Sequence, residues 1–102
     1  MFEFDPETKY IIRTNRAGVF FGNIAEFDPA TRIIKLENVR RIWYWDGACS
    51  LSELAALGTT NPEDCKFSIT VNNLIICEVI EIIPCSENAA TQIEGVGEWK
   101  RH

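Results

Sequence analysis

The chain has 102 residues, of which 46% are hydrophobic and 25% are charged. These proportions are typical of a soluble globular protein and exclude general disorder. No apolar run approaches the ~18 residues that a membrane span requires. The acidic N-terminus lacks the basic flank and apolar core of a secretory signal. We therefore expect a single domain over residues 1–102, with no membrane partner.

The formal net charge is -5, which argues against a DNA or RNA partner because a phosphate backbone favours a basic surface. The charge is unevenly distributed. Residues 1–50 contain seven basic and seven acidic side chains, whereas residues 51–102 contain three and eight. The acidic second half would therefore suit a basic protein partner.

Five segments are rich in β-branched and aromatic residues and predict strands: 9–14, 18–27, 32–45, 66–71 and 74–83. Asp28-Pro29-Ala30-Thr31 has turn chemistry and joins the second and third segments into a long hairpin, bent near residues 37–38. We expect Asn72-Asn73 to form another turn. In the hairpin we expect Phe27 opposite Arg32, Phe20 opposite Val39 and Gly18 opposite Arg41.

Two short helices complete the prediction. Ser50 and Glu53 have the spacing of a capping box, with Gly58 as the stop, and Ser86 could begin a helix over 86–94. The segment 74–83 is apolar on both faces, which predicts a central strand or one covered by a second subunit, and hence a homo-oligomer. The expected fold class is α+β, mostly antiparallel β: a small curled or barrel-like sheet of about five strands with one or two short helices.

The four cysteines do not predict a metal site. Cys49, Cys65, Cys77 and Cys85 contain no C-x-x-C pair, and the only histidine is His102. We therefore expect free thiols, as in a reducing cytoplasm, and neither metal nor cofactor. Cys49 precedes a predicted helix but has no neighbouring base, so we predict no catalytic residue and no enzyme.

A cluster between the third strand and the first helix predicts a ligand site. Arginines can grip phosphate, aromatic rings can stack on a base, and small residues before a helix admit an anion. The alternatives are that the arginines pair with carboxylates, that the rings are core, and that Ser50 only caps its helix. The candidate residues are Arg16, Gly18, Arg40, Arg41, Trp43, Tyr44, Trp45, Gly47, Ala48, Ser50 and Ser52.

Several stretches resemble a family of small bacteriophage- and prophage-encoded proteins classed as a domain of unknown function. They include Ala17-Gly18-Val19-Phe20-Phe21-Gly22, Arg40-Arg41-Ile42-Trp43-Tyr44-Trp45-Asp46-Gly47-Ala48 and Glu78-Val79-Ile80-Glu81-Ile82-Ile83-Pro84. The resemblance implies a phage protein in the cytoplasm of a bacterial host, and it carries no activity with it.

Small phage proteins often counter host defence, and one class sequesters nucleotide signals. We therefore expect an anti-defence protein that binds a phosphate-bearing nucleotide, such as a cyclic nucleotide or ADP-ribose derivative of CBASS or Thoeris systems. The alternatives are a protein–protein inhibitor or regulator of a host factor, and a minor phage structural or assembly protein.

Overall fold

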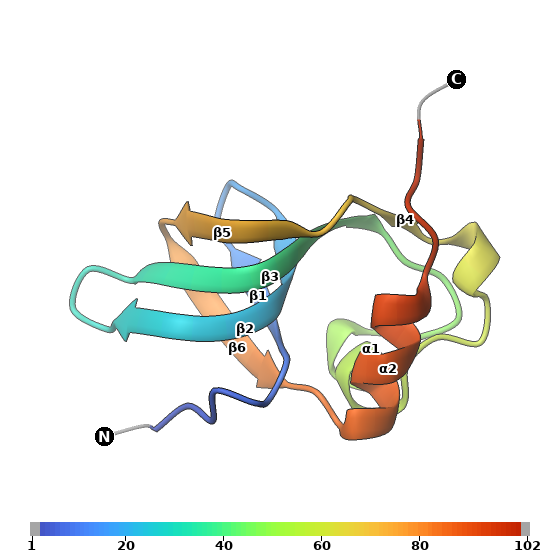
Figure 1. Cartoon of the computed structure of the whole chain (residues 1–102), viewed down its shortest axis with the longest axis horizontal. Helices are drawn as coiled ribbons and strands as arrows, with labels where there is room; N and C mark the ends of the chain where they lie inside the picture. Colours follow the sequence, from blue (N-terminus) through green and yellow to red (C-terminus); the bar gives the residue numbers. More distant parts are fainter. Residues whose placement is uncertain (1–2, 101–102) are drawn as a thin grey trace.

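Six strands form one antiparallel sheet that curls without closing (Figure 1). The computed structural model describes residues 3–100. The strands are β1 (Tyr10–Thr14), β2 (Val19–Asp28), β3 (Ile33–Tyr44), β4 (Lys66–Phe67), β5 (Val71–Ile76) and β6 (Val79–Pro84). Their order is β4-β3-β2-β1-β6, and β5 pairs with β3 on the same edge as β4. The expected fold class, a mostly antiparallel α+β sheet, is confirmed.

Two helices, α1 (Leu51–Leu57) and α2 (Glu87–Gly95), lie side by side at one end of the sheet (Figure 1). Ser50 accepts a hydrogen bond from the Glu53 N–H at 3.1 Å, and Ser86 accepts one from the Ala89 N–H at 3.0 Å. Both predicted N-caps are therefore confirmed. The loop between α1 and β4 also contains a short 3-10 helix, Pro62–Asp64.

The sheet buries apolar residues on both faces. Ile12 and Phe20 point into an inner core within the curl, whereas their neighbours Ile11 and Phe21 point into an outer core beneath the helices. This alternation follows from the two-residue period of a strand. Leu54 of α1 and Ile93 of α2 complete the outer core, and both are fully buried. These two cores hold β3, which contains the candidate residues Arg40, Arg41, Trp43 and Tyr44.

The register of the β2–β3 hairpin differs by two residues from our expectation. Phe27 lies opposite Ile34, and Phe20 lies opposite Arg41. The turn is longer because the Asp28 carboxylate accepts hydrogen bonds from the Ala30 N–H and the Thr31 hydroxyl. The expected bend is present: the register shifts between residues 21 and 23, and Asn38 has a φ of 50°.

The prediction of one strand over 74–83 is wrong. The segment breaks at Cys77–Glu78, so that β5 pairs with β3 while β6 pairs with β1 at the other edge of the sheet. Glu78 makes this corner in a left-handed conformation, with a φ of 60°. Burial on both faces is found instead in β1, where Tyr10, Ile11, Ile12 and Thr14 are buried, and in the first half of β2.

The segment before the corner also differs from our expectation. Only Lys66 and Phe67 of the predicted strand 66–71 pair as β4. The expected turn at Asn72-Asn73 is absent, and both residues lie inside β5 because this strand follows β3 through Val39. The β3 edge is therefore lined almost continuously by residues 66–76.

Candidate functional site

Arg40 is part of the protein scaffold. Its side chain is buried, and its guanidinium donates to the carbonyl oxygens of Ser68 at 2.8 Å, Ile93 at 2.9 Å and Val96 at 2.7 Å. The latter two lie in and just after the last turn of α2, where carbonyls lack helical partners and the helix dipole favours a cation. Burial lowers the pKa of Arg40, and the Glu98 carboxylate opposes this effect. Arg40 therefore ties the end of α2 to β3, in place of the phosphate contact that we expected.

Arg16 and Gly18 lie in the turn between β1 and β2. The Arg16 guanidinium makes two short contacts with the Glu78 carboxylate at 3.0 Å, which raises the pKa of Arg16 and lowers that of Glu78. Gly18 has a φ of 102°, and no heavy atom would lie within 4 Å of a Cβ added to it. The structure thus joins Arg16 to the β5–β6 corner, as the alternative of carboxylate pairing anticipated.

Gly47 and Ala48 are enclosed by protein. A side chain on Gly47 would lie 2.6 Å from the Thr59 Oγ1 atom and 2.7 Å from the Asn61 nitrogen, and its φ is 83°. Ala48 packs against the outer core. The backbone at this turn is therefore covered by the loop after α1 and is not open to a ligand.

The remaining candidates divide between scaffold and surface. Ser50 caps α1, and Ser52 is exposed on that helix. Trp45 packs against the outer core, which agrees with the alternative that some rings are core. Trp43 and Tyr44 are instead 53% and 50% exposed. Only Arg41, Trp43 and Tyr44 of the candidate arginines and rings remain together on an accessible part of β3.

These three residues belong to a larger group that we call the aromatic surface: Arg41, Trp43, Tyr44, Lys66 and Trp99. The Trp43 and Trp99 rings meet edge to face with centroids 5.6 Å apart. The Lys66 ammonium lies 5.3 Å from the Trp99 ring centroid and 6.0 Å from that of Tyr44. Within residues 3–100, neither Lys66 nor Arg41 has a carboxylate at ion-pair distance.

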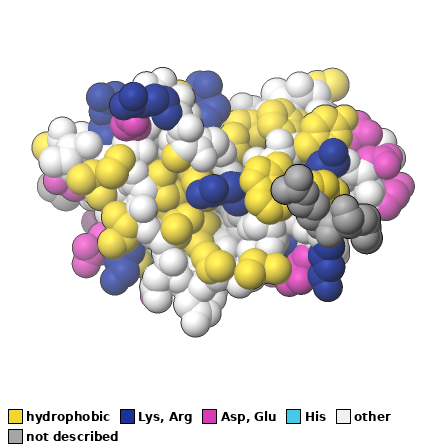
Figure 2. All heavy atoms as spheres, turned by 90° about the horizontal axis from the view of Figure 1, so that it is seen from above, with side chains coloured by type: hydrophobic (Ala, Val, Ile, Leu, Met, Phe, Trp, Pro, Cys, Tyr) yellow, Lys and Arg dark blue, Asp and Glu magenta, His cyan; other side chains and the backbone are white. Residues whose placement is uncertain are grey.

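The aromatic surface is held by backbone pairing. Tyr44 pairs with Lys66 across β3 and β4, and the Trp99 N–H donates to the Phe67 carbonyl at 2.9 Å. Figure 2 shows hydrophobic side chains on this face of the molecule, with Lys and Arg side chains among them. Our sequence reasoning missed Lys66 and Trp99, because no local pattern indicates that β4 pairs with the end of β3.

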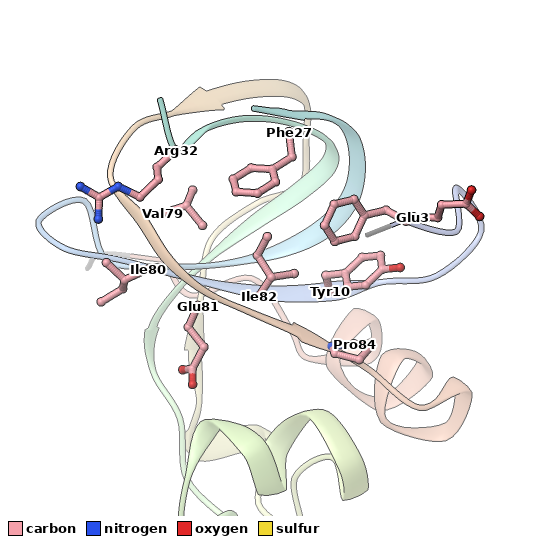
Figure 3. A pocket seen from close by; sticks show the side chains of 10 residues that line it. Glu3, Tyr10, Phe27, Arg32, Val79, Ile80, Glu81, Ile82 and Pro84 are labelled. Atoms are coloured by element: carbon pink, nitrogen blue, oxygen red, sulfur yellow. The ribbon is translucent and has the colours of Figure 1, made fainter. Parts of the chain in front are cut away.

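A second feature that the sequence did not indicate is an apolar cavity of about 470 Å³ between β6, the β2–β3 turn and the N-terminal segment. Figure 3 shows Phe27, Val79, Ile82 and Tyr10 around it, with Arg32 and Glu3 at opposite ends. The Phe4 ring meets the Tyr10 and Phe27 rings edge to face. The cavity is the open mouth of the inner core, partly filled by Phe4.

The cysteines are free in this structure. Cys49 and Cys77 are exposed, Cys65 is buried, and burial raises the pKa of Cys85 to about 12. In the described part of the chain, no three His, Cys, Asp or Glu side chains are placed to hold a metal ion. None of the helices in residues 3–100 has the length and apolar character to cross a membrane. His102 lies outside the described residues.

These features define a small α+β domain with one exposed surface of aromatic and basic side chains. The chain belongs to a family described as Domain of unknown function (DUF6948), whose model matches residues 7–93. No curated protein and no solved structure matches the chain.

Proposed function

We propose that this protein is a non-enzymatic binder of a phosphate-bearing, nucleotide-derived ligand, and that the aromatic surface is its site. The observation that carries the proposal is that Lys66 lies beside the exposed rings of Tyr44 and Trp99. Arg41, two residues before the exposed Trp43 in β3, is exposed as well, and neither cation has a carboxylate at ion-pair distance in residues 3–100. A base can stack on an exposed ring, and each stacked base contributes about 1–3 kcal/mol. Free cations can then contact phosphate oxygens.

The two cations differ in their freedom to reach a ligand. The Arg41 guanidinium lies 4.8 Å from the Phe20 ring centroid, so a buried ring fixes the direction of its side chain. Lys66 instead touches two exposed rings. Arg41 would therefore offer a preorganised contact, and Lys66 a mobile one that follows the phosphate.

The biological setting is also part of the proposal. The resemblance to phage- and prophage-encoded proteins supports a role in the bacterial host cytoplasm, where the protein would sequester a defence signal such as a cyclic nucleotide or an ADP-ribose derivative. Sequestration is stoichiometric, so the ligand would be released intact when the protein is denatured.

The test is calorimetric titration with a cyclic dinucleotide, a cyclic trinucleotide, ADP-ribose and cyclic ADP-ribose, and with inorganic phosphate for comparison. We expect at least one nucleotide to bind, and Trp43→Ala and Lys66→Ala each to weaken it by roughly tenfold or more. Arg13→Ala is the matched control, because Arg13 is an exposed cation paired with Glu81 on β6. Equal weakening by the control, or no binding at all, would refute the proposal.

The second candidate function is inhibition or regulation of a host protein. Exposed Trp, Tyr and Arg side chains are enriched at the centres of protein interfaces, and the aromatic surface has all three. Capture of a host protein by the wild type but not by Trp43→Ala, without any nucleotide binding, would favour this function.

A further inference from the structure

The outer edge of β5 has no partner in residues 3–100. On its other edge β5 pairs with β3 from Ile34↔Ile76 to Val39↔Val71. The neighbouring β4 edge differs, because Glu98 bridges to Phe67 and the Trp99 N–H binds the Phe67 carbonyl. The C-terminal segment thus covers β4 and leaves β5 uncovered. Figure 1 shows β5 along the top of the sheet, away from both helices.

The β5 edge lacks the features that keep edge strands apart. Soluble proteins protect such edges with charged side chains, proline or bulges. The other edge strand, β6, follows this rule: it contains Glu81, which is paired with Arg13, and it ends at Pro84. Residues 67–77, in contrast, contain no charged residue and no proline. Ile69, Val71 and Ile75 in this stretch are 55%, 37% and 67% exposed.

We propose that two copies of the chain dimerise by pairing their β5 strands antiparallel about Asn73. The sequence of β5 is self-complementary in this register. Val71 lies opposite the partner's Ile75, and Asn73 lies opposite the partner's Asn73. A two-fold symmetric interface requires such reciprocal contacts. The two Val71–Ile75 pairs lie on the same face of the joined sheet, because the side chains of a strand point to alternate faces and these residues are four apart.

The charges beside β5 permit this pairing. The proposed two-fold axis passes beside Asn73. The carboxylate nearest to it across the sheet is that of Glu37, which lies in β3 and pairs with Asn73 of β5. The two Glu37 residues of a dimer would lie three strand spacings apart, roughly 14 Å, which exceeds the ~8 Å screening length at physiological salt. The pairing therefore does not bring the two Glu37 carboxylates within close range of each other.

The dimer would also place part of the partner subunit beside the aromatic surface, although the dimer proposal does not depend on the proposed function. Continuing the register places the partner's Cys77 opposite Ile69. Ile69 follows Ser68, whose N–H donates to the Arg41 carbonyl at 2.8 Å. The partner's β5–β6 corner would thus border the aromatic surface of the first copy, and with it the partner's Arg16.

Light scattering and a charge substitution test the dimer. At micromolar concentration we expect twice the 11.6 kDa mass of one chain. Ile75→Lys should give the single-chain mass, because a lysine on the edge opposes pairing. Leu57→Lys is the matched control, since Leu57 is 66% exposed on α1, and it should remain dimeric. A wild type of 11.6 kDa, or an Ile75→Lys variant of dimer mass, would overturn the proposal.

Disulfide trapping tests the register. In a background with Cys49→Ser and Cys77→Ser, Asn73→Cys should form a cross-linked dimer on oxidation, because axial residues of an antiparallel pair have Cα atoms about 4.5–5.5 Å apart. Asn72→Cys should not cross-link, because its two copies are offset along the strands beyond the ~7 Å limit for a disulfide. Both positions are exposed, so both variants should fold. Equal cross-linking at the two positions would refute pairing about Asn73.

Discussion

Arg40 and Arg41 are neighbours in β3, but their guanidinium groups lie on opposite faces of the sheet. The Arg40 group lies 5.4 Å from the Phe67 ring centroid on the outer-core side, where it binds the carbonyls at the end of α2. The Arg41 group lies over the Phe20 ring on the inner-core side and is exposed. One arginine is thus a structural cation and its neighbour is available to a ligand.

This division predicts different effects of removing each charge. Arg40→Ala should lower the free energy of unfolding by about 3 kcal/mol, because it leaves several buried carbonyls unpaired. That loss corresponds to roughly 15 °C in Tm for a chain of this size. Arg41→Ala should lose only about 0.5–1 kcal/mol, the value of an exposed cation–π contact. Thermal unfolding followed by circular dichroism measures both, and comparable losses would contradict the division.

Local signals were sufficient for the parts of the fold that local chemistry determines. Ser50 and Ser86 each precede a helix and bind an N–H three residues later, so the caps were visible in the sequence. The break between β5 and β6 at Cys77–Glu78 was not visible in the sequence. Its cause is a long-range contact: the Asn15 N–H donates to the Glu78 carbonyl, and Arg16 pairs with the Glu78 side chain. No periodicity within residues 74–83 encodes those partners.

The site was predicted only in part, because some of its residues are close in sequence and others are brought together by long-range pairing. The exposed rings of Trp43 and Tyr44 lie in the stretch that the sequence singled out. Gly47 was misinterpreted, because a glycine that admits a ligand and one that admits the Thr59–Asn61 backbone look identical in a sequence. Lys66 and Trp99 are brought to the rings only by strand pairing, which single-sequence patterns do not specify.

Gly47 is predicted to be intolerant of any side chain. Gly47→Ala should destabilise the protein by about 2 kcal/mol or more, because the new Cβ would collide with backbone nitrogen atoms and the φ of 83° strains an L-residue. Gly97→Ala is the control, because nothing lies within 4 Å of its hypothetical Cβ. Urea denaturation compares the two variants. A midpoint for Gly47→Ala that equals that of the control would show that the loop after α1 moves freely.

Because the Cys85 thiol is partly buried, we predict that the free energy of unfolding of the protein falls at alkaline pH. Burial raises its pKa to about 12 from the ordinary value of 9.0, which we take for the unfolded chain. The thiol therefore contributes stability that is fully present below pH 9 and is lost as the pH rises towards 12, because only the unfolded chain releases the proton. Other groups also titrate there, so the measurement is the difference in urea midpoint between the wild type and Cys85→Ala. That difference should shrink above about pH 9, and a constant difference would contradict the buried thiol.

Phe4 is predicted to narrow the mouth of the inner core. Its ring centroid lies 5.6 Å from that of Tyr10 and 6.0 Å from that of Phe27, and the Tyr10 hydroxyl accepts a hydrogen bond from the Asp5 N–H at 3.1 Å. Phe4→Ala should lower the free energy of unfolding by about 1–3 kcal/mol, from two aromatic contacts and the lost burial.

The same substitution should widen the cavity of about 470 Å³ and expose its apolar wall, so that the variant binds a hydrophobic fluorescent dye while still folded. Glu7→Ala is the matched control, because Glu7 is exposed in the same segment and its N–H rather than its carboxylate makes the local hydrogen bond to Asp5. Dye fluorescence and thermal unfolding are measured on both variants below their melting temperatures. If Phe4→Ala matches the control in both, Phe4 does not narrow the mouth, and the curl of β6 over the inner core is stable without it.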